Sequence, residues 1–271
     1  MQTTVLAVLA AALLSTAPAV GAAPDGLGFQ WPHGQKTAVS LGYDDALDTQ
    51  LDHVIPALDR AGLKGSFYLQ LSSPAVERRL DAWRAAARNG HELGNHSLFH
   101  QCSGRAAAWV RPQRDLDTTS VAQMQDQLAL ANTMLYAIDG QRERTFTVPC
   151  GSTQAGDGDY LPAVAGSFVA VKHGGTLLLA AANGALRTIP VDAYAPNGHS
   201  GKQLIAMVEK AAARGRLVTF TFHGVGGEHL ATSSAAHDEL VQYLAAHRQH
   251  YWTDTLLNIM TYVRQQDRGD D

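Results

Sequence analysis

The chain has 271 residues, of which 45% are hydrophobic and 17% are charged, and its formal net charge is -4 at pH 7. This length and composition suit one fairly large globular domain with a single core. The slightly acidic balance argues against nucleic acid or an anionic membrane surface as a partner, because both are bound by clusters of Lys and Arg.

Residues 1–23 are predicted to be a signal peptide. The stretch 3–23 is apolar and ends in small residues of the kind that a signal peptidase accepts, although no basic residue precedes it. A membrane anchor is the alternative, but polar residues and a proline at 15–18 leave the apolar run short of the ~20 residues that a spanning helix needs. We therefore expect that the chain has no stable membrane insertion and that residues 24–271 form a domain exported to the periplasm or the medium.

The remaining chain is predicted to alternate between strands and helices. Patterns of apolar residues predict strands at 37–42, 65–71, 92–94, 145–148, 168–171, 186–189 and 217–222. Helices are expected at 51–61, 76–89, 120–139, 201–214, 234–247 and 253–264. This alternation implies an α/β fold in which a parallel sheet, either open or closed as a barrel, has its helices outside.

Polar clusters follow several of these strands, at 44–45, 96–100, 149–151, 192 and 223. The carboxyl ends of parallel strands lie at one edge of a sheet or at one mouth of a barrel. We therefore expect these clusters to meet in space.

Two adjacent carboxylates, Asp44 and Asp45, follow the first buried strand. On a turn they can point at one centre, so that one binds a metal while the other stays free as a base. The alternative is that an Asp caps the next helix.

His96 and His100 are four residues apart, which on a helical turn places both imidazoles on one face, close enough to share a metal ion. Two histidines and one carboxylate would leave positions open for water and substrate. Chance spacing in a chain with 12 histidines is the alternative. The pair His91 and Glu92 does not fit the metalloprotease pattern H-E-x-x-H, because His96 comes one residue too late.

His223 follows an apolar strand and precedes a loop that starts at Gly224 and is rich in glycine. This placement suits a general acid that must reach a substrate, whereas the alternative is a core or loop histidine. No G-x-S-x-G elbow of a serine esterase accompanies the loop.

The two cysteines, Cys102 and Cys150, lie in or just after segments that are predicted to meet at the site. An exported protein enters an oxidising compartment, so these cysteines could form one disulfide. Two unpaired buried thiols are the alternative.

Taken together, these segments resemble the motifs of the polysaccharide deacetylases of carbohydrate esterase family 4. The first motif, T-F-D-D-G, is similar to residues 42–46, and the second, H-[ST]-x-x-H, is matched by 96–100. The third, R-x-P-x-G, keeps its Pro and Gly in 147–151 but has Thr in place of Arg. Asp192 is the candidate for the acidic fourth motif, and 220–223 match the fifth, an apolar-x-apolar-His pattern.

The resemblance implies a single distorted (β/α) barrel with fewer than eight complete units and a metal site at the carboxyl ends of its strands. It further implies that Asp45, His96 and His100 hold one divalent metal, commonly zinc.

The same resemblance implies catalytic roles for other motif residues. Asp44 would be the general base, the backbone N-H of Cys150 would contact the oxyanion, and His223, oriented by Asp192, would protonate the leaving group. It also implies that two motif residues contact the substrate, Tyr43 and Pro149. Thr147 leaves open how Asp44 is oriented, since the motif arginine normally steadies the base.

The implied function is the metal-dependent removal of acetyl groups from a carbohydrate, either as N-acetyl or as O-acetyl. One alternative is a carbohydrate-binding relative with little or no turnover, suggested by the altered third motif. Another is the hydrolysis of amide bonds in compounds other than sugars.

Overall fold

The computed structural model describes residues 30–180 and 186–267. The predicted signal peptide at 1–23 lies outside the described residues. Within the described ranges, no helix is both long enough and apolar enough to cross a bilayer.

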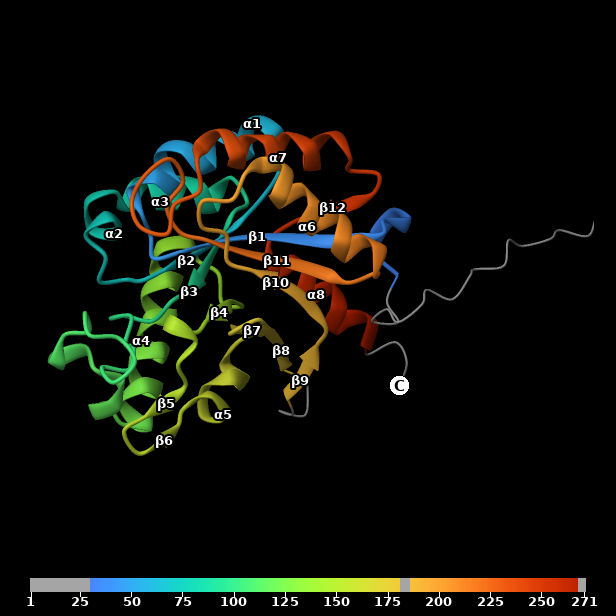
Figure 1. Ribbon diagram of the computed structural model, residues 1–271. Coiled ribbons are helices and arrows are strands. Elements are labelled where there is room, and N and C mark those ends of the chain that lie inside the picture. The colour runs from blue at the N-terminus through green and yellow to red at the C-terminus, as the bar shows by residue number, and fades with distance from the viewer. Residues whose placement is uncertain (1–29, 181–185, 268–271) are drawn as a thin grey trace, which may run out of the picture.

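A ten-stranded sheet forms the centre of the molecule and curls into a nearly closed barrel (Figure 1). Across the sheet the strands are β10 (Val191–Tyr194), β11 (Leu217–Phe222), β1 (Thr37–Asp44), β2 (Ser66–Leu69), β3 (Glu92–Asn95), β4 (Thr145–Thr147), β7 (Ala170–His173), β8 (Thr176–Ala180) and β9 (Leu186–Ile189), while β12 (Tyr251–Thr253) pairs with β1. The pairings from β10 to β7 are all parallel, whereas β8 and β9 are antiparallel. The predicted distorted barrel with fewer than eight complete units is thereby confirmed.

Helices surround this sheet (Figure 1). They are α1 (Ile55–Ala61), which continues a π-helical turn at Gln50–Val54, α2 (Pro74–Arg78), α3 (Leu80–Arg88), α4 (Val121–Asp139), α5 (Leu161–Val164), α6 (Gly201–Ala213), α7 (Ser234–Ala246) and α8 (Leu256–Asp267). The long helices α4 and α6 each start with a capping box, in which Ser120 pairs with Gln123 and Ser200 with Gln203. These reciprocal bonds satisfy backbone groups that a helix start leaves unpaired.

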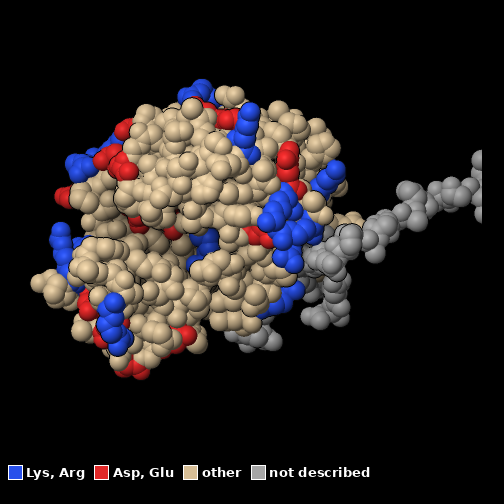
Figure 2. Space-filling view, in the orientation of Figure 1, with Lys and Arg blue, Asp and Glu red and all other residues tan. Residues whose placement is uncertain are grey.

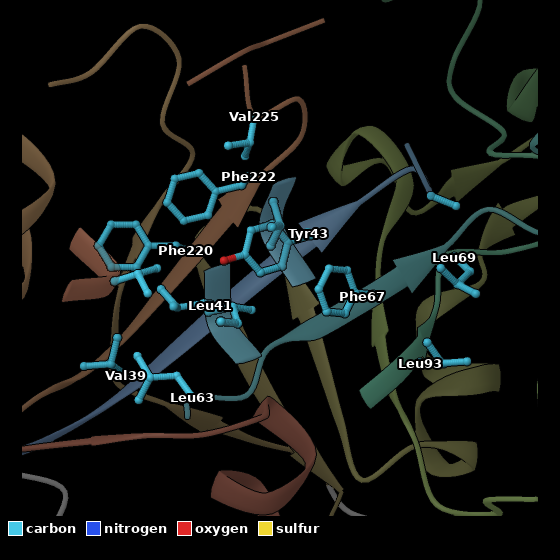
Figure 3. Close-up of a cluster of buried hydrophobic side chains, with 14 of the residues drawn as sticks. Val39, Leu41, Tyr43, Leu63, Phe67, Leu69, Leu93, Phe220, Phe222 and Val225 are labelled. Carbon is cyan, nitrogen blue, oxygen red and sulfur yellow. The ribbon is translucent and has the colours of Figure 1, made fainter. Parts of the chain in front are cut away.

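The main core lies between the strands and the outer helices and is rich in aromatic side chains (Figure 3). Tyr43 of β1 stacks between Phe67 of β2 and Phe222 of β11, with ring centroids 4.9 and 5.5 Å away. Successive side chains of a strand point to opposite faces. Because Tyr43 faces this core, its neighbour Asp44 faces the interior of the barrel.

The hairpin between β7 and β8 is a departure from the predicted parallel sheet. His173 pairs with Thr176 across a two-residue turn, in which Gly174 and Gly175 have φ values of 51° and 87°. Positive φ at both central positions is typical of a type I′ hairpin turn, which returns the chain antiparallel. The Gly-Gly pair is therefore a sequence signal for this hairpin, which the period of a strand does not reveal.

Other boundaries also differ from those predicted. The expected helix at 76–89 is divided into α2 and α3 at Arg79. The last helix begins at Leu256, three residues later than predicted, because β12 extends to Thr253. The loop expected at 151–160 contains a small hairpin of β5 (Gln154–Ala155) and β6 (Gly158–Asp159).

Candidate functional site

Most of the polar residues predicted from the sequence gather around one cavity at the carboxyl ends of the central strands. The cavity has a volume of about 940 Å³. It is lined by six of the predicted site residues, namely Asp44, Asp45, His96, His100, Cys150 and His223. In the space-filling view, acidic and basic atoms are visible inside a hollow in this face of the molecule (Figure 2).

A sharp turn at the end of β1 positions the two adjacent carboxylates. Asp45 and Ala46 have φ values of 79° and 55°, which are uncommon for residues other than glycine and redirect the chain within two residues. Gln50 Nε2 donates to the backbone oxygen of Asp44 at 2.6 Å and holds this turn. The N-cap of the following helical segment is Thr49, so neither aspartate serves as that cap.

His96 and His100 lie on an irregular turn instead of the expected helical one. Ser97 and His100 have φ values of 65° and 54°, which a right-handed helix does not contain. The turn is held by side chains: Asn95 Oδ1 accepts from the Ser97 N-H at 2.7 Å, and Ser97 Oγ accepts from the His100 N-H at 2.9 Å. The two imidazoles still end 4.8 Å apart between centroids.

Asp45, His96 and His100 form a candidate metal centre. Asp45 Oδ1 lies 3.3 Å from His96 Nε2 and 3.2 Å from His100 Nε2, and the three donor atoms are within 4.8 Å of one another. Although it is buried, this oxygen has no hydrogen-bond partner. His96 Nδ1 is bonded to the backbone oxygen of Thr147 at 2.8 Å, which leaves Nε2 as the free acceptor. One carboxylate oxygen and two imidazole nitrogens suit a zinc ion.

The charges of this centre are coupled. Burial disfavours the charge of Asp45, but favourable interactions with His100, His229 and His96 outweigh burial and hold the pKa of the Asp45 carboxyl well below its usual range. Burial lowers the pKa of the His96 imidazole, but the charges of Asp44 and Asp45 outweigh burial and raise this pKa above its usual value. These interactions favour the anionic form of Asp45, which is the form that binds a metal.

His223 follows β11 and lines the same cavity. Its Nε2 lies 3.9 Å from Asp45 Oδ2. Burial lowers the pKa of the His223 imidazole, and the nearby Asp44 and Asp45 only partly oppose this effect.

His229, which the sequence analysis did not select, also contacts the centre. Its Nε2 lies 2.7 Å from Asp45 Oδ2. The loop that carries it is tied to the start of the first helical segment, since Glu228 accepts from the Thr49 N-H at 3.2 Å and the Val225 N-H donates to Thr49 Oγ1 at 3.3 Å. The sequence indicates a loop rich in glycine after β11, but only the fold shows that this loop brings His229 to Asp45.

Lys172 is a second residue that the sequence analysis missed. It lies on β7, lines the cavity and is buried, with its Nζ 3.8 Å from Asp44 Oδ1. A single lysine on an interior strand carries no motif, so no pattern in the sequence marked it.

A disulfide joins Cys102 to Cys150, with the two Cα atoms 5.8 Å apart. It links the segment after His96 and His100 to the short 3-10 helix Pro149–Gly151 beside the cavity. Cys102 Sγ also lies 3.5 Å from His100 Nδ1. With both sulfurs oxidised, the nearby group of His100, Cys102 and Cys150 offers no thiolate to a metal.

Asp192 does not reach His223. In the sheet it is the register partner of Val218, five residues before His223, and its carboxylate pairs with Arg214 and Arg216 at the opposite end of β11. Along a strand of about 3.3 Å per residue, this separation is too large for direct contact. We therefore do not assign Asp192 to the site.

The two predicted substrate contacts also lie outside the cavity. Tyr43 is completely buried in the outer core, where its hydroxyl bonds to His237 Nε2 at 2.8 Å. Pro149 is buried, and its neighbours Val148 and Cys150 line the cavity in its place. Consecutive side chains of a strand point to opposite sides, so Tyr43 faces the outer core while Asp44 faces the cavity.

The fold and the cavity together define a (β/α)-barrel protein with carboxylates and histidines gathered at the carboxyl ends of its strands. The sequence profile of the family described as Polysaccharide deacetylase matches residues 32–159. This segment is just under half of the chain, and the match confirms the resemblance seen in the motifs.

Solved structures share the fold at low sequence identity. A polysaccharide deacetylase candidate from Mycobacterium smegmatis is 17% identical with a TM-score of 0.63, covering 91% of this chain and 95% of its own. The peptidoglycan deacetylase PdaC from Bacillus subtilis is 16% identical with a TM-score of 0.54, covering 88% and 96%. A pseudoenzyme of the CE4 family from Bacillus anthracis is 17% identical with a TM-score of 0.52, covering 83% and 66%.

A gellan lyase from Bacillus sp is 26% identical over 122 residues, which are 45% of this chain. The chain spans only 4% of the length of that relative.

Proposed function

We propose that this chain is a metal-dependent hydrolase that removes acetyl groups from a carbohydrate. The observation that carries the proposal is the buried Asp45 Oδ1, which has no hydrogen-bond partner and faces the Nε2 atoms of His96 and His100. In this arrangement the three residues would hold one divalent ion, with zinc the best match to the donor set. When bound, the ion would supply Lewis acidity toward a water molecule and an acetyl carbonyl.

Asp44 is proposed as the general base. Its carboxylate is buried beside the centre, with Oδ2 3.9 Å from His96 Nε2, and it lines the cavity from which a substrate would approach. A carboxylate in this place can accept a proton from the attacking water and hold that water in line.

The leaving group would meet His223, whose side chain is partly exposed to the cavity. It can donate a proton from Nε2 to the departing amine or alcohol. The backbone N-H of Cys150 is proposed to contact the oxyanion, because this residue lines the cavity at a positive φ of 53° and is held there by the disulfide.

The substrate is proposed to be an acetylated oligosaccharide or polysaccharide. A cavity of about 940 Å³ has room for more than an acetyl group, and the exposed indole of Trp109 at its wall offers an apolar face to a sugar ring. We propose an exported location for this chain, because its disulfide suits an oxidising compartment and one structural neighbour is a peptidoglycan deacetylase.

The test combines metal content with acetate release from chitooligosaccharides and from acetylated xylan, each with and without a chelator. The wild-type protein is expected to hold one zinc per chain and to lose acetate release on chelation. Asp45→Ala should lose both the zinc and the acetate release, with a fall in rate of about a thousandfold or more, since the metal lowers the barrier by several kcal/mol. Asp81→Asn removes an exposed carboxylate far from the cavity and serves as the control.

Full activity of Asp45→Ala would contradict the proposal. Zinc binding without acetate release from any acetylated sugar would instead favour a carbohydrate-binding protein without turnover, as the CE4 pseudoenzyme among the neighbours illustrates. Release from small amides alone would favour a hydrolase of compounds other than sugars.

A further inference from the structure

We infer that Lys172 is a positioning residue for Asp44: its ammonium group balances the buried carboxylate and fixes the direction in which that carboxylate points. The inference rests on the proposed function, because it assigns Lys172 a part in the reaction for which Asp44 is the base.

The two charged groups face each other in a closed environment. Lys172 Nζ lies 3.8 Å from Asp44 Oδ1, and the two side chains are 7% and 4% exposed. Among the described residues, Lys172 is the only Lys or Arg in an ion pair with Asp44. Neither atom has a hydrogen-bond partner, so the pair is held by charge and leaves both groups free to bond to a water or a substrate between them.

The neighbouring residues are shaped to admit the lysine. A Cβ atom at Gly42 of β1 would lie 3.0 Å from Lys172 Nζ and 2.8 Å from the backbone oxygen of Phe220. The absence of a side chain at Gly42 therefore opens the path from β7 across the barrel to Asp44. The ammonium also lies 4.7 Å from the centre of the Tyr68 ring, a distance at which the ring face attracts a cation.

A second buried carboxylate is already engaged elsewhere. Glu92 accepts from the Thr145 N-H at 3.1 Å, from Ser66 Oγ at 2.6 Å and from the Leu257 N-H at 3.0 Å. Asp44, in contrast, keeps an unpartnered oxygen that points at the lysine. Burial lowers the pKa of Lys172, and Asp44 and Glu92 act against this effect.

The register of the sheet shows why position 172 supplies the cation. Lys172 is the direct partner of Thr147 across the parallel strands β4 and β7, and both line the cavity. The Thr147 hydroxyl is buried without a hydrogen-bond partner and carries no charge. Neighbouring strands lie only about 4.8 Å apart, so the lysine reaches Asp44 from a place next to Thr147.

The experiment is a double-mutant cycle that combines Lys172→Met with Asp44→Asn. Urea midpoints are measured in the presence of a chelator, so that neither metal nor turnover affects them. If the pair is real, Lys172→Met lowers the midpoint, and more than half of this drop disappears in the Asp44→Asn background. Lys202→Met, which removes an exposed lysine, is the matched control and should leave the midpoint and the activity unchanged.

Acetate release by the same variants tests the positioning role. Lys172→Met should lower kcat by at least about tenfold with KM within about twofold, because the substrate still binds while the base is misaligned. Its zinc content should stay that of the wild type. Lys172→Arg, which retains the charge, should recover a large part of the lost kcat.

When the variants fold, three results would overturn the inference: equal drops in the midpoint in both backgrounds, an unchanged kcat in Lys172→Met, or loss of zinc together with activity. The last of these would mean that Lys172 only maintains the fold of the centre. If Lys172→Met fails to fold while the double variant folds, this result demonstrates the coupling directly. If neither variant folds, the inference is overturned. A wild-type protein without activity would refute the proposed function, but the cycle would still decide whether the two residues are coupled.

Discussion

His229 Nε2 lies 2.7 Å from Asp45 Oδ2, so the loop after β11 contacts the same carboxylate whose other oxygen faces His96 and His100. This bond directs Asp45 Oδ1 toward the two imidazoles. If Asp45 binds a metal as proposed, His229 would orient this ligand without binding the metal itself.

The contact predicts a defect in metal affinity for His229→Ala. Loss of such an orienting partner typically costs about 10–100-fold in metal affinity, and we expect a value in this range from zinc titration against a competing chelator. His229→Gln, which can still donate to Asp45, should recover most of it. His199→Ala removes a partly buried histidine that does not line the cavity and is the control. Unchanged affinity in His229→Ala would show that Asp45 is oriented without it.

Trp109 is expected to bind the substrate outside the reacting group. Its side chain is 67% exposed at the wall of the cavity, and its ring centroid is 6.5 Å from that of His100. Trp109→Ala should raise KM for an acetylated oligosaccharide by about three- to tenfold, corresponding to about 0.5–1.5 kcal/mol for one aromatic contact. KM for a small activated acetate ester should not change. Phe99→Ala is the control, because Phe99 is exposed but does not line the cavity.

The disulfide is expected to stabilise both the fold and the site. Cys102 and Cys150 are 48 residues apart in the sequence, and cross-linking a loop of this kind contributes about 2–4 kcal/mol to the free energy of unfolding. Replacing both cysteines with Ser should lower this free energy by that amount in urea titrations. A reducing agent should do the same to the wild-type protein and nothing to the double variant. A reductant effect on the double variant would contradict this assignment.

Because His91 is buried, we expect the folded protein to lose stability in mild acid. The Gly65 N-H donates to His91 Nδ1 at 3.1 Å, and His91 Nε2 bonds to Asp59 Oδ1 at 3.0 Å, so the buried imidazole must be neutral to accept from Gly65. Burial lowers the pKa of His91, with Asp59 opposing. In the unfolded chain His91 takes up a proton near pH 6.5, whereas in the folded chain it does so only at lower pH. The free energy of unfolding therefore falls as the pH drops below about 6.5 toward the folded pKa.

Urea midpoints between pH 8 and pH 5 measure this effect. His91→Phe should be less stable at pH 8, because the bonds to Gly65 and Asp59 are lost, but its midpoint should depend less steeply on pH. His33→Gln, at an exposed position, should keep the wild-type slope. An unchanged slope in His91→Phe would assign the pH dependence to other histidines.

Part of the architecture was accessible from the sequence because its causes are local. Apolar periodicity indicated most of the parallel strands, and the shared edge of those strands explained why clusters as distant as Asp45 and His223 meet at one cavity. The period of two along β1 could also have excluded Tyr43 from the site, and the pair Gly174-Gly175 could have predicted the hairpin. These signals depend only on neighbours in the chain.

By itself, the sequence determined the types of residue at the centre, their order and the strand ends at which they lie. Only the tertiary structure decided which side chains contact them. Lys172 faces Asp44 because β7 stands next to β4 in register with Thr147, and Asp192 misses His223 because it lies five residues lower along the neighbouring strand. The physical reason is that contacts across a barrel depend on strand order, register and the space left by residues such as Gly42, none of which is encoded within a single segment.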